Sequence, residues 1–336
     1  GRKIHKGYTA HMGGVVIFIA FAVAMFSSVL QMMDKINMLQ LLAFITLLSI
    51  VVVLGVRDDM NSLSPKTKLL CEMVVGFLFC YLDIRLYSFY GLFGVYELPI
   101  WLSYILTIAF IIVVCNAYNL IDGIDGQAGT QALAVFLFLA GFLFHLIYAT
   151  DVLHQDTFFA NANFWMIAFV AIIGSLIGFL VFNWQPAKIF MGDTGSLFIG
   201  TLIALSIIMS MNYSGADPIL IYDYEIKAKI LVFPMFFFLP FADTLRVFVS
   251  RIRRGKSPFS ADKTHIHHFL LRTGYSHQRT AITNFVIQVV VSLISIIVAF
   301  LISDLFYIIY IVAIWVIYVV VLRFTIQKKI ANHKHN

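Results

Sequence analysis

Five aspartates lie in three short polar stretches, and each stretch directly adjoins a long apolar run. In chain order they are Asp58, Asp59, Asp122, Asp125 and Asp193. Carboxylate oxygens with few histidine or cysteine ligands beside them favour Mg²⁺, which uses one or two carboxylates together with substrate phosphates. If the three stretches meet in the fold, these acids could hold a divalent cation and support phosphoryl transfer, which depends on charge neutralisation and positioning.

The stretch NLIDGIDG, residues 119–126, contains two of these acids. Asp122 and Asp125 lie three residues apart, so on a helical turn their side chains would face the same way. The glycine after each acid permits a tight turn, and Asn119 adds a neutral oxygen ligand one turn earlier. A connection between two helices with an aspartate N-cap would have the same pattern, so that interpretation stays open at this point.

The other acids also have two interpretations. Adjacent carboxylates such as Asp58 and Asp59 repel each other, which raises one pKa unless a cation lies close, but a polar end to a helix is the alternative explanation. Asp193 lies in the stretch MGDTGS, whose glycines leave backbone N–H groups open at a helix start, where phosphates bind. The stretch lacks the lysine of a P-loop, so it does not indicate a Walker A motif.

Three histidines lie in the basic stretch 251–280, which we expect to be a long cytoplasmic loop. They form the motif HIHH as His265, His267 and His268. Zinc binding is one interpretation, but no cysteine lies near the motif. Contacts to phosphate, by charge or by hydrogen bonds, are the favoured interpretation, and solvated loop histidines are the alternative.

The elements that must position these residues are membrane-spanning helices. Of the 336 residues, 61% are hydrophobic and only 12% are charged, whereas soluble domains have about 25% charged residues. We therefore predict an all-α polytopic membrane protein with a single transmembrane domain over residues 1–336 and no nucleic-acid partner. Because the sequence does not begin with methionine, we expect one further N-terminal helix upstream. The ten apolar runs that are candidate spans are 13–33, 37–56, 67–83, 99–116, 127–149, 163–182, 195–212, 228–250, 281–303 and 305–324.

The distribution of charge predicts which side of the membrane holds the polar stretches. With ten spans, one side contains residues 1–12, 57–66, 117–126, 183–194, 251–280 and 325–336. Together with the adjoining helix ends, this side carries 19 of the 23 lysines and arginines. An excess of basic residues marks cytoplasmic loops, so we predict an inner-membrane protein whose catalytic loops are cytoplasmic. This topology explains much of the net charge of +6, although a polyanionic ligand could also use it.

A transporter is the alternative from another class of protein, because it would also cross the membrane many times. Transporters typically place ionisable residues at mid-helix and break helices near the midplane. Here the spans hold few charges, chiefly Glu72 and the pair Asp243 and Arg246, which are three residues apart and can neutralise each other. The one-sided polar stretches therefore favour an enzyme that joins a soluble phosphate donor to a lipid headgroup.

Together, the polar stretches resemble the polyprenyl-phosphate N-acetylhexosamine-1-phosphate transferases, a polytopic family of WecA/TagO-like enzymes that also includes MraY. The resemblance covers nearly the whole chain. It rests, in chain order, on RKIHKGYTAHMGG, DD after the second span, NAYNLIDGIDG, FMGDTGS and DTLRVFVSRIRRGKSPFSADKTHIHH. The HIHH pattern is more similar to WecA/TagO than to MraY.

The resemblance implies a reaction. An N-acetylhexosamine-1-phosphate, in the first place GlcNAc-1-phosphate, passes from a UDP-sugar to polyprenyl (undecaprenyl) phosphate, and UMP is released. Mg²⁺ is the implied cofactor, with Mn²⁺ as a substitute. The product starts a cell-surface polysaccharide, such as a lipopolysaccharide O-antigen or a teichoic acid. Alternatives are an MraY-like phospho-MurNAc-pentapeptide transferase and a FucNAc- or QuiNAc-specific homologue.

The resemblance also implies roles for residues around the cation. Asp193 should ligate Mg²⁺, with Asn119 as a second ligand. Asp58 should be the base or the partner of the lipid phosphate, supported by Asp59. Whether Asp58 instead acts as a covalent nucleophile stays open.

The remaining matched residues should bind the donor. The HIHH histidines would hold the diphosphate or the sugar, while Phe190 would stack on uracil. The nucleotide pocket would also include Lys6, Asp122 and Asp125. A homodimer is a further expectation, since the GxxxG spacing of Gly174 and Gly178 permits close helix packing within or between chains.

Overall fold

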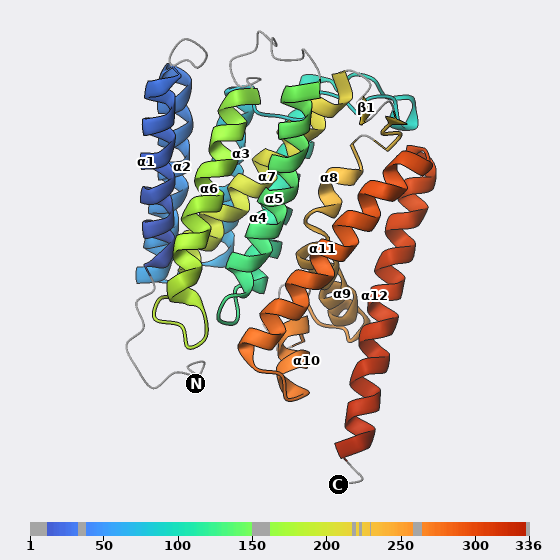
Figure 1. Cartoon of the computed structure of the whole chain (residues 1–336). Coiled ribbons are helices and arrows are strands. Elements are labelled where there is room, and N and C mark those ends of the chain that lie inside the picture. Colours follow the sequence, from blue (N-terminus) through green and yellow to red (C-terminus); the bar gives the residue numbers. More distant parts are fainter. Residues whose placement is uncertain are drawn as a thin grey trace.

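The computed structural model of the chain describes residues 12–32, 38–149, 162–216, 220–221, 224–228, 230–257 and 264–333. These residues are almost entirely helical, and the two strands found among them form one antiparallel pair of two residues each. Lys6 lies outside the described residues. The elements in Figure 1 are α1 (Gly13–Gln31), α2 (Met38–Met60), α3 (Pro65–Tyr81), the 3₁₀ turn η1 (Leu92–Gly94), α4 (Ile100–Ile121), α5 (Gln127–Ala149), α6 (Ala162–Asn183), α7 (Gly192–Ala216), β1 (Leu220–Ile221), β2 (Tyr224–Glu225), α8 (Val232–Met235), α9 (Phe238–Arg253), α10 (Ile266–Arg272), α11 (His277–Leu301) and α12 (Asp304–His333).

Within the described part of the chain, eight helices are long and apolar enough to cross a membrane. They are α1, α2, α4, α5, α6, α7, α11 and α12, and each matches one of the predicted runs. The all-α polytopic class is therefore confirmed, and two of the ten predicted runs, 67–83 and 228–250, are not among these eight helices. The run 67–83 forms α3, whose 17 residues are at the lower end of the length range of a membrane-spanning helix. Its start is fixed by Ser64, whose hydroxyl accepts a hydrogen bond from the Thr67 N–H at 3.1 Å.

The predicted span 228–250 is wrong as a single helix, because it is interrupted between α8 and α9. Pro240 is the third residue of α9, a first-turn position at which a missing N–H costs little. Gln288 of α11 stabilises the interruption. Its side chain donates to the Met235 carbonyl at 3.0 Å and accepts from the Leu239 N–H at 2.8 Å. A polar side chain from a neighbouring helix thus satisfies backbone groups that the interruption leaves without helical partners.

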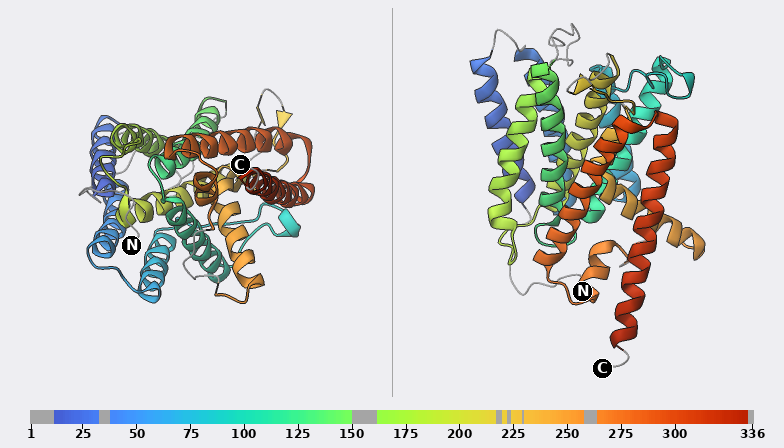
Figure 2. Two further views of the ribbon diagram at one scale, coloured as in Figure 1. Left: turned by 90° about the horizontal axis from the view of Figure 1, so that it is seen from below. Right: turned by 45° about the vertical axis from the view of Figure 1, so that its right-hand side comes forward.

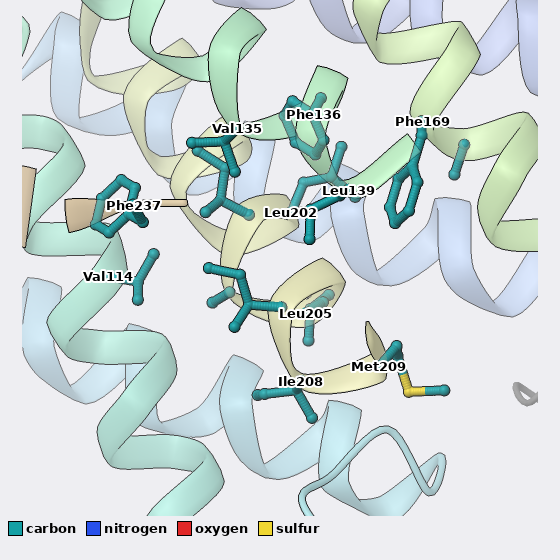
Figure 3. Close-up of a cluster of buried hydrophobic side chains, with 14 of the residues drawn as sticks. Val114, Val135, Phe136, Leu139, Phe169, Leu202, Leu205, Ile208, Met209 and Phe237 are labelled. Carbon is teal, nitrogen blue, oxygen red and sulfur yellow. The ribbon is translucent and has the colours of Figure 1, made fainter. Parts of the chain in front are cut away.

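Helix α7 forms the centre of the bundle. Its residues 194–213 are all buried, and it packs against α1, α2, α4 and α5. Figure 3 shows Leu202 and Leu205 of α7 between Val114 of α4 and side chains of α5. A helix that is apolar on every side is stable only when it is surrounded. The central packing of α7 fixes the position of its first turn, which contains Asp193.

The polar stretches meet at the end of the bundle that carries α10 (Figure 1). Helix α12 extends beyond the other helices at this same end (Figure 2). The stretch 251–280 is not one long loop as expected, because it contains the last residues of α9, all of α10 and the start of α11. This organisation places the HIHH motif at the start of a short helix that packs against α11.

Candidate active site

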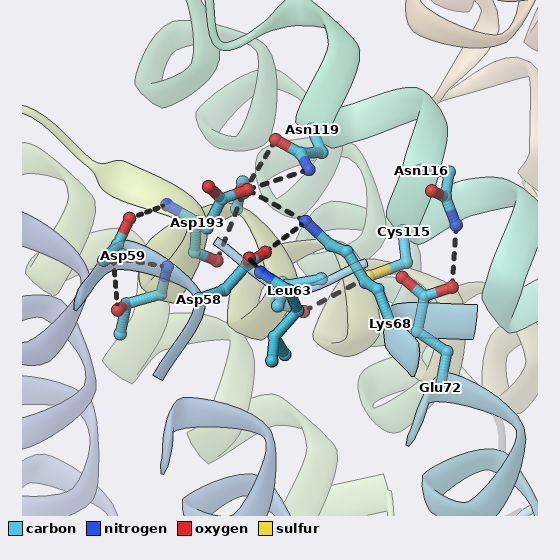
Figure 4. A network of polar contacts seen from close by, with 12 residues as sticks. Asp58, Asp59, Leu63, Lys68, Glu72, Cys115, Asn116, Asn119 and Asp193 are labelled. Carbon is cyan, nitrogen blue, oxygen red and sulfur yellow. Dashed lines mark hydrogen bonds and ion pairs between the residues drawn. The ribbon is translucent and has the colours of Figure 1, made fainter. Parts of the chain in front are cut away.

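Four helices contribute to one polar cluster, shown in Figure 4. Asp58 comes from the end of α2, Lys68 from α3, Asn119 from α4 and Asp193 from the first turn of α7. The Lys68 ammonium donates to Asp58 Oδ2 and to Asp193 Oδ1, both at 2.9 Å. The Asn119 amide donates to the same Asp193 oxygen at 3.1 Å. The structure therefore brings together three of the predicted site residues from distant parts of the chain.

Asp59 has a different position from its neighbour Asp58. Its Oδ1 accepts from the Asp193 N–H at 2.8 Å, and its Oδ2 accepts from the Thr194 N–H at 3.0 Å. The Thr194 hydroxyl also donates to Oδ2 at 2.6 Å. Asp59 thus caps α7 from another helix, where its negative charge interacts favourably with the N-terminus. It acts on the cluster by positioning Asp193.

Glycines allow α1, α2 and α7 to approach closely around this cap. A Cβ added at Gly55 would overlap the backbone of Thr194, and one added at Gly14 would overlap the backbone of Gly195. The Gly14 N–H also donates to the Met191 carbonyl at 3.0 Å. The glycines beside the acidic motifs are therefore required by backbone contact at the start of α7.

Asp122 directly follows α4, close enough to Asp193 and Asp59 for their charges to act on it. Helix α4 ends at Ile121, so the expected helical turn across NLIDGIDG is not formed. Burial and the charges of Asp193 and Asp59 raise the pKa of Asp122 to about 7. A divalent cation beside these carboxylates would favour the ionised form of Asp122.

Asp125 is turned to other partners. It is buried, and its Oδ2 accepts from the Ala187 N–H at 3.2 Å, while its Oδ1 lies 3.5 Å from His277 Nδ1. These contacts connect the α4–α5 loop with the α6–α7 connection and with the first turn of α11. The structure therefore separates the two aspartates of NLIDGIDG, which were expected to face the same way.

Asp243 organises the HIHH motif from α9. It is fully buried and accepts hydrogen bonds from Arg246, from His265 Nδ1 at 2.9 Å and from the Ile266 N–H at 3.2 Å. The Tyr318 hydroxyl of α12 donates to it at 3.2 Å. The expected ion pair between Asp243 and Arg246 is confirmed, with a shortest distance of 2.6 Å. Arg246 also donates to the Thr264 carbonyl, so the pair holds the start of α10 in place.

The histidine motif contacts the acidic loop through His267. The His267 imidazole lies against Gly123, where an added Cβ would be 2.5 Å from Nε2. His265 stacks parallel to His267 at 5.9 Å between ring centroids, and His268 lies 4.2 Å from His267 on the same measure. Burial and the neighbouring His268 lower the pKa of His267 to about 3. His267 is therefore a neutral hydrogen-bonding group at physiological pH, and the interpretation as a cationic contact does not apply to it.

Phe190 lies in the connection between α6 and α7, next to the start of α1. Its side chain is half-buried, and its carbonyl accepts from the Gly13 N–H at 3.0 Å. It is three residues before Asp193 in the sequence. The role of Phe190 in stacking on uracil stays a prediction.

The donor set of the cluster fits Mg²⁺. Among the described residues, no group of three histidine, cysteine or carboxylate side chains forms a complete metal site. Asp58 and Asp193 nevertheless converge on a single cation, the Lys68 ammonium, with Asn119 beside them. Mg²⁺ usually takes only one or two carboxylates and completes its shell with water and substrate phosphates.

Two residues of this site did not appear among the predicted site residues. Lys68 was not singled out in the sequence, although a lysine inside the apolar run 67–83 is itself a signal of function. Asp243 was interpreted only as half of an ion pair, since nothing in the sequence shows that its other oxygen reaches the HIHH motif.

A bundle of apolar helices with a carboxylate cluster at one end defines a polytopic membrane protein with an enzyme-like site. Comparison with known proteins identifies the class further. Residues 41–211 match Glycosyl transferase family 4, and the chain belongs to this family. The match includes Asp58, Lys68, Asn119 and Asp193, so the cluster lies in the family's shared region. The protein is an enzyme of the phosphoglycosyltransferase type, and the transporter interpretation is not supported.

Individual relatives agree with this assignment. The chain is 32% identical to the probable undecaprenyl-phosphate N-acetylglucosaminyl 1-phosphate transferase of Bacillus subtilis, over 87% of the chain and 74% of that protein. It is 30% identical to the decaprenyl-phosphate N-acetylglucosaminephosphotransferase of Mycobacterium tuberculosis, over 84% of the chain and 70% of that protein. It is 34% identical to the phospho-N-acetylmuramoyl-pentapeptide-transferase of Streptococcus pyogenes, but over only 60% of each chain.

Proposed function

We propose that the protein transfers GlcNAc-1-phosphate from UDP-GlcNAc to a polyprenyl phosphate such as undecaprenyl phosphate. An oxygen of the lipid phosphate forms a bond to the β-phosphorus of the donor, and the bond from that phosphorus to the bridging oxygen breaks. UMP leaves with the electron pair of the broken bond. The observation that carries the proposal is the cluster of Asp58, Lys68, Asn119 and Asp193 at one end of an apolar bundle. The names of relatives that match most of the chain support the sugar and the lipid.

The residues of the cluster suit an in-line displacement between two phosphates. Asp193 and Asp58, with Asn119 beside them, would hold Mg²⁺ or Mn²⁺, which when bound neutralises charge on the diphosphate. Asp58 is the group that would accept a proton from the lipid phosphate or orient it. Lys68, which bridges Asp58 and Asp193, would balance their negative charge when no cation is bound. Asp59 keeps Asp193 in position without contacting substrate.

The donor would bind between the α4–α5 loop and α10. Asp122 lies in this loop near the cluster, and the His267 imidazole of α10 contacts Gly123 of the same loop. A neutral His267 can donate to phosphate or sugar oxygens without adding charge. Lys6 and Phe190 would complete the proposed nucleotide pocket. Asp125 would hold the backbone beside this pocket in place, because it accepts a hydrogen bond from the Ala187 N–H.

The cellular setting follows from the same proposal. The charge distribution supports an inner-membrane protein whose site faces the cytoplasm, where nucleotide sugars are made available. The product would be the first lipid-linked sugar of a cell-surface polysaccharide. A homodimer is compatible with Gly174 and Gly178, which lie exposed on α6.

Release of UMP tests the proposal directly. Purified protein in detergent should form UMP when it receives undecaprenyl phosphate, MgCl₂ and UDP-GlcNAc, and should form none when the lipid or the metal is omitted. UDP-MurNAc-pentapeptide, UDP-FucNAc and UDP-QuiNAc serve as competing donors. The pentapeptide donor is the second candidate because of the Streptococcus pyogenes relative. Asp193→Ala should insert normally and form no UMP. Absence of UMP with every donor would overturn the proposal.

A further inference from the structure

Lys68 occupies the position that a divalent cation would take. Its ammonium lies 2.9 Å from Asp58 Oδ2 and 2.9 Å from Asp193 Oδ1, so it is held by both carboxylates. A divalent cation that binds these two carboxylates would repel the ammonium at such short range. Binding of the cation therefore requires a second position for the Lys68 side chain.

Glu72 lies one helical turn from Lys68 on α3. It is a buried carboxylate with 9% of its surface exposed, and its Oε2 accepts from the Asn116 amide at 2.8 Å. Its Oε1 is buried and has no hydrogen-bond partner within the described part of the chain. A buried carboxylate oxygen without a donor is unfavourable, so it indicates a partner that is present in another state. Residues four apart on a helix can pair, which brings Glu72 within reach of Lys68.

A cavity connects the two side chains. Both Lys68 and Glu72 line it, together with Leu63, Cys115 and Thr201. Its volume is about 20 Å³, which is enough for about one water-sized group. Because the lysine side chain has a flexible stem of four carbons, its ammonium can rotate within α3 toward this space without movement of the helix.

We propose that Glu72 provides a second binding position for the Lys68 ammonium, which moves there when a divalent cation binds between Asp58 and Asp193. The inference rests on the cation position in the proposed function. When Asp58, Asp193 and Glu72 are all ionised, these carboxylates and the Lys68 ammonium sum to two negative charges, which a divalent cation would neutralise. Glu72 thus contributes to cation affinity without being a ligand, because it keeps the lysine positive charge paired but away from the cation.

Cation binding without any nucleotide tests the inference. Mn²⁺ binding to purified protein, measured by electron paramagnetic resonance, should weaken about tenfold in Glu72→Gln, because Lys68 then loses its charged second position. Glu72→Asp keeps a carboxylate and should stay within about threefold of the wild type. Glu97→Gln removes the same charge ahead of α4, at the opposite end from Asn119, and should leave Mn²⁺ affinity unchanged. Wild-type Mn²⁺ affinity in Glu72→Gln would overturn the inference.

A second substitution shows whether Glu72 acts through Lys68. In a Lys68→Met background no ammonium needs to move, so Glu72→Gln should change Mn²⁺ affinity by less than about twofold. An equal loss in both backgrounds would show that Glu72 acts independently of Lys68, and the inference would be wrong. If Mn²⁺ binding depends on Glu72 as expected but no donor yields UMP, the proposed reaction fails and the cation response stands. If UMP is formed while wild-type protein binds no Mn²⁺, the inference fails and the transfer stands.

Discussion

Asp59 at the end of α2 binds both the backbone N–H and the hydroxyl of Thr194 in the first turn of α7, at 3.0 and 2.6 Å. The contact joins two segments that are 135 residues apart in the sequence. It also fixes the neighbouring Asp193, whose N–H donates to the other oxygen of Asp59. The acidic pair DD therefore divides its roles, with Asp58 at the cluster and Asp59 at the helix cap.

Asp59→Asn should lower activity only by displacing Asp193, because Asp59 holds Asp193 in place without contacting substrate. The amide retains one acceptor but loses the charge at the N-terminus of α7, which should cost about 0.5–2 kcal/mol of stability. We expect UMP formation to fall at least about tenfold, because small displacements of catalytic groups are costly. UMP release and thermal unfolding in detergent measure the two effects. Asp83→Asn, a matched change at the far end of α3, should leave activity unchanged. Full activity in Asp59→Asn would show that the cap does not position Asp193.

Gly123→Ala should disturb the contact between the acidic loop and α10. The new methyl group would overlap the His267 imidazole, which is buried and cannot move aside freely. We expect Gly123→Ala to lower kcat/KM at least about tenfold in the wild-type background. In a His267→Ala background the overlap is absent, so the same change should lower kcat/KM less. Steady-state kinetics of UMP release give both values.

Gly141→Ala is the matched control for this substitution. Gly141 lies within α5 and has no neighbouring atom near an added Cβ, so alanine there should preserve activity and slightly favour the helix. If the effects of Gly123→Ala and His267→Ala were simply additive, the added methyl group would not act through its overlap with the His267 imidazole.

The sequence predicts much of the fold because the bilayer imposes one simple pattern. Long apolar runs became the eight spanning helices, since each backbone polar group must be paired within the helix in lipid. The run 228–250 has the same composition but contains an interruption that depends on Gln288, far along the chain. Composition within a run does not show such a tertiary partner.

The sequence shows which motifs form the site, but it does not show the role of each residue within those motifs. Asp58, Asn119 and Asp193 meet as expected, because helix ends on one side of a compact bundle converge. Asp59 and Asp125 are equally acidic and close to the same motifs, yet their contacts include backbone N–H groups of other segments. Asp58 accepts from the Leu63 N–H through Oδ1, and its Oδ2 binds Lys68 in the cluster. Only the three-dimensional partners distinguish a carboxylate that caps or supports a loop from one that can bind a cation.

Cation affinity should depend on pH through Asp122. Without a cation the pKa of Asp122 is about 7, because burial and the charges of Asp193 and Asp59 disfavour its ionised form. Below this pH the protonated side chain adds no negative charge, and above it the carboxylate attracts the cation. Mn²⁺ affinity should therefore rise up to about tenfold between pH 6 and pH 8, as the ionised fraction increases. Mn²⁺ titrations at several pH values measure the slope.

Asp122→Asn provides the comparison for this pH dependence. The amide does not titrate, so the part of the increase that comes from Asp122 should disappear, while the site still binds Mn²⁺ through its other carboxylates. The remaining increase would come from Glu72, whose pKa burial also raises to about 7. The same increase in Asp122→Asn would assign the pH dependence to a different group. The substitution should also raise the donor concentration needed for turnover, if Asp122 contacts the nucleotide side of the site.

Asp243 should be essential for the structure of the HIHH segment. Asp243→Asn would leave the Arg246 guanidinium without its carboxylate in a largely buried position, which typically costs about 3–5 kcal/mol. At the same time, one of the two oxygens that accept from His265 and from the Ile266 N–H would be replaced by an NH₂ group, which cannot accept. We expect a lower unfolding temperature and little UMP formation. The double variant Asp243→Asn with Arg246→Met removes the unpaired charge, so it should recover part of the stability but little activity, because His265 still lacks the carboxylate that orients its ring. Recovery of both would show that Asp243 serves only to neutralise Arg246.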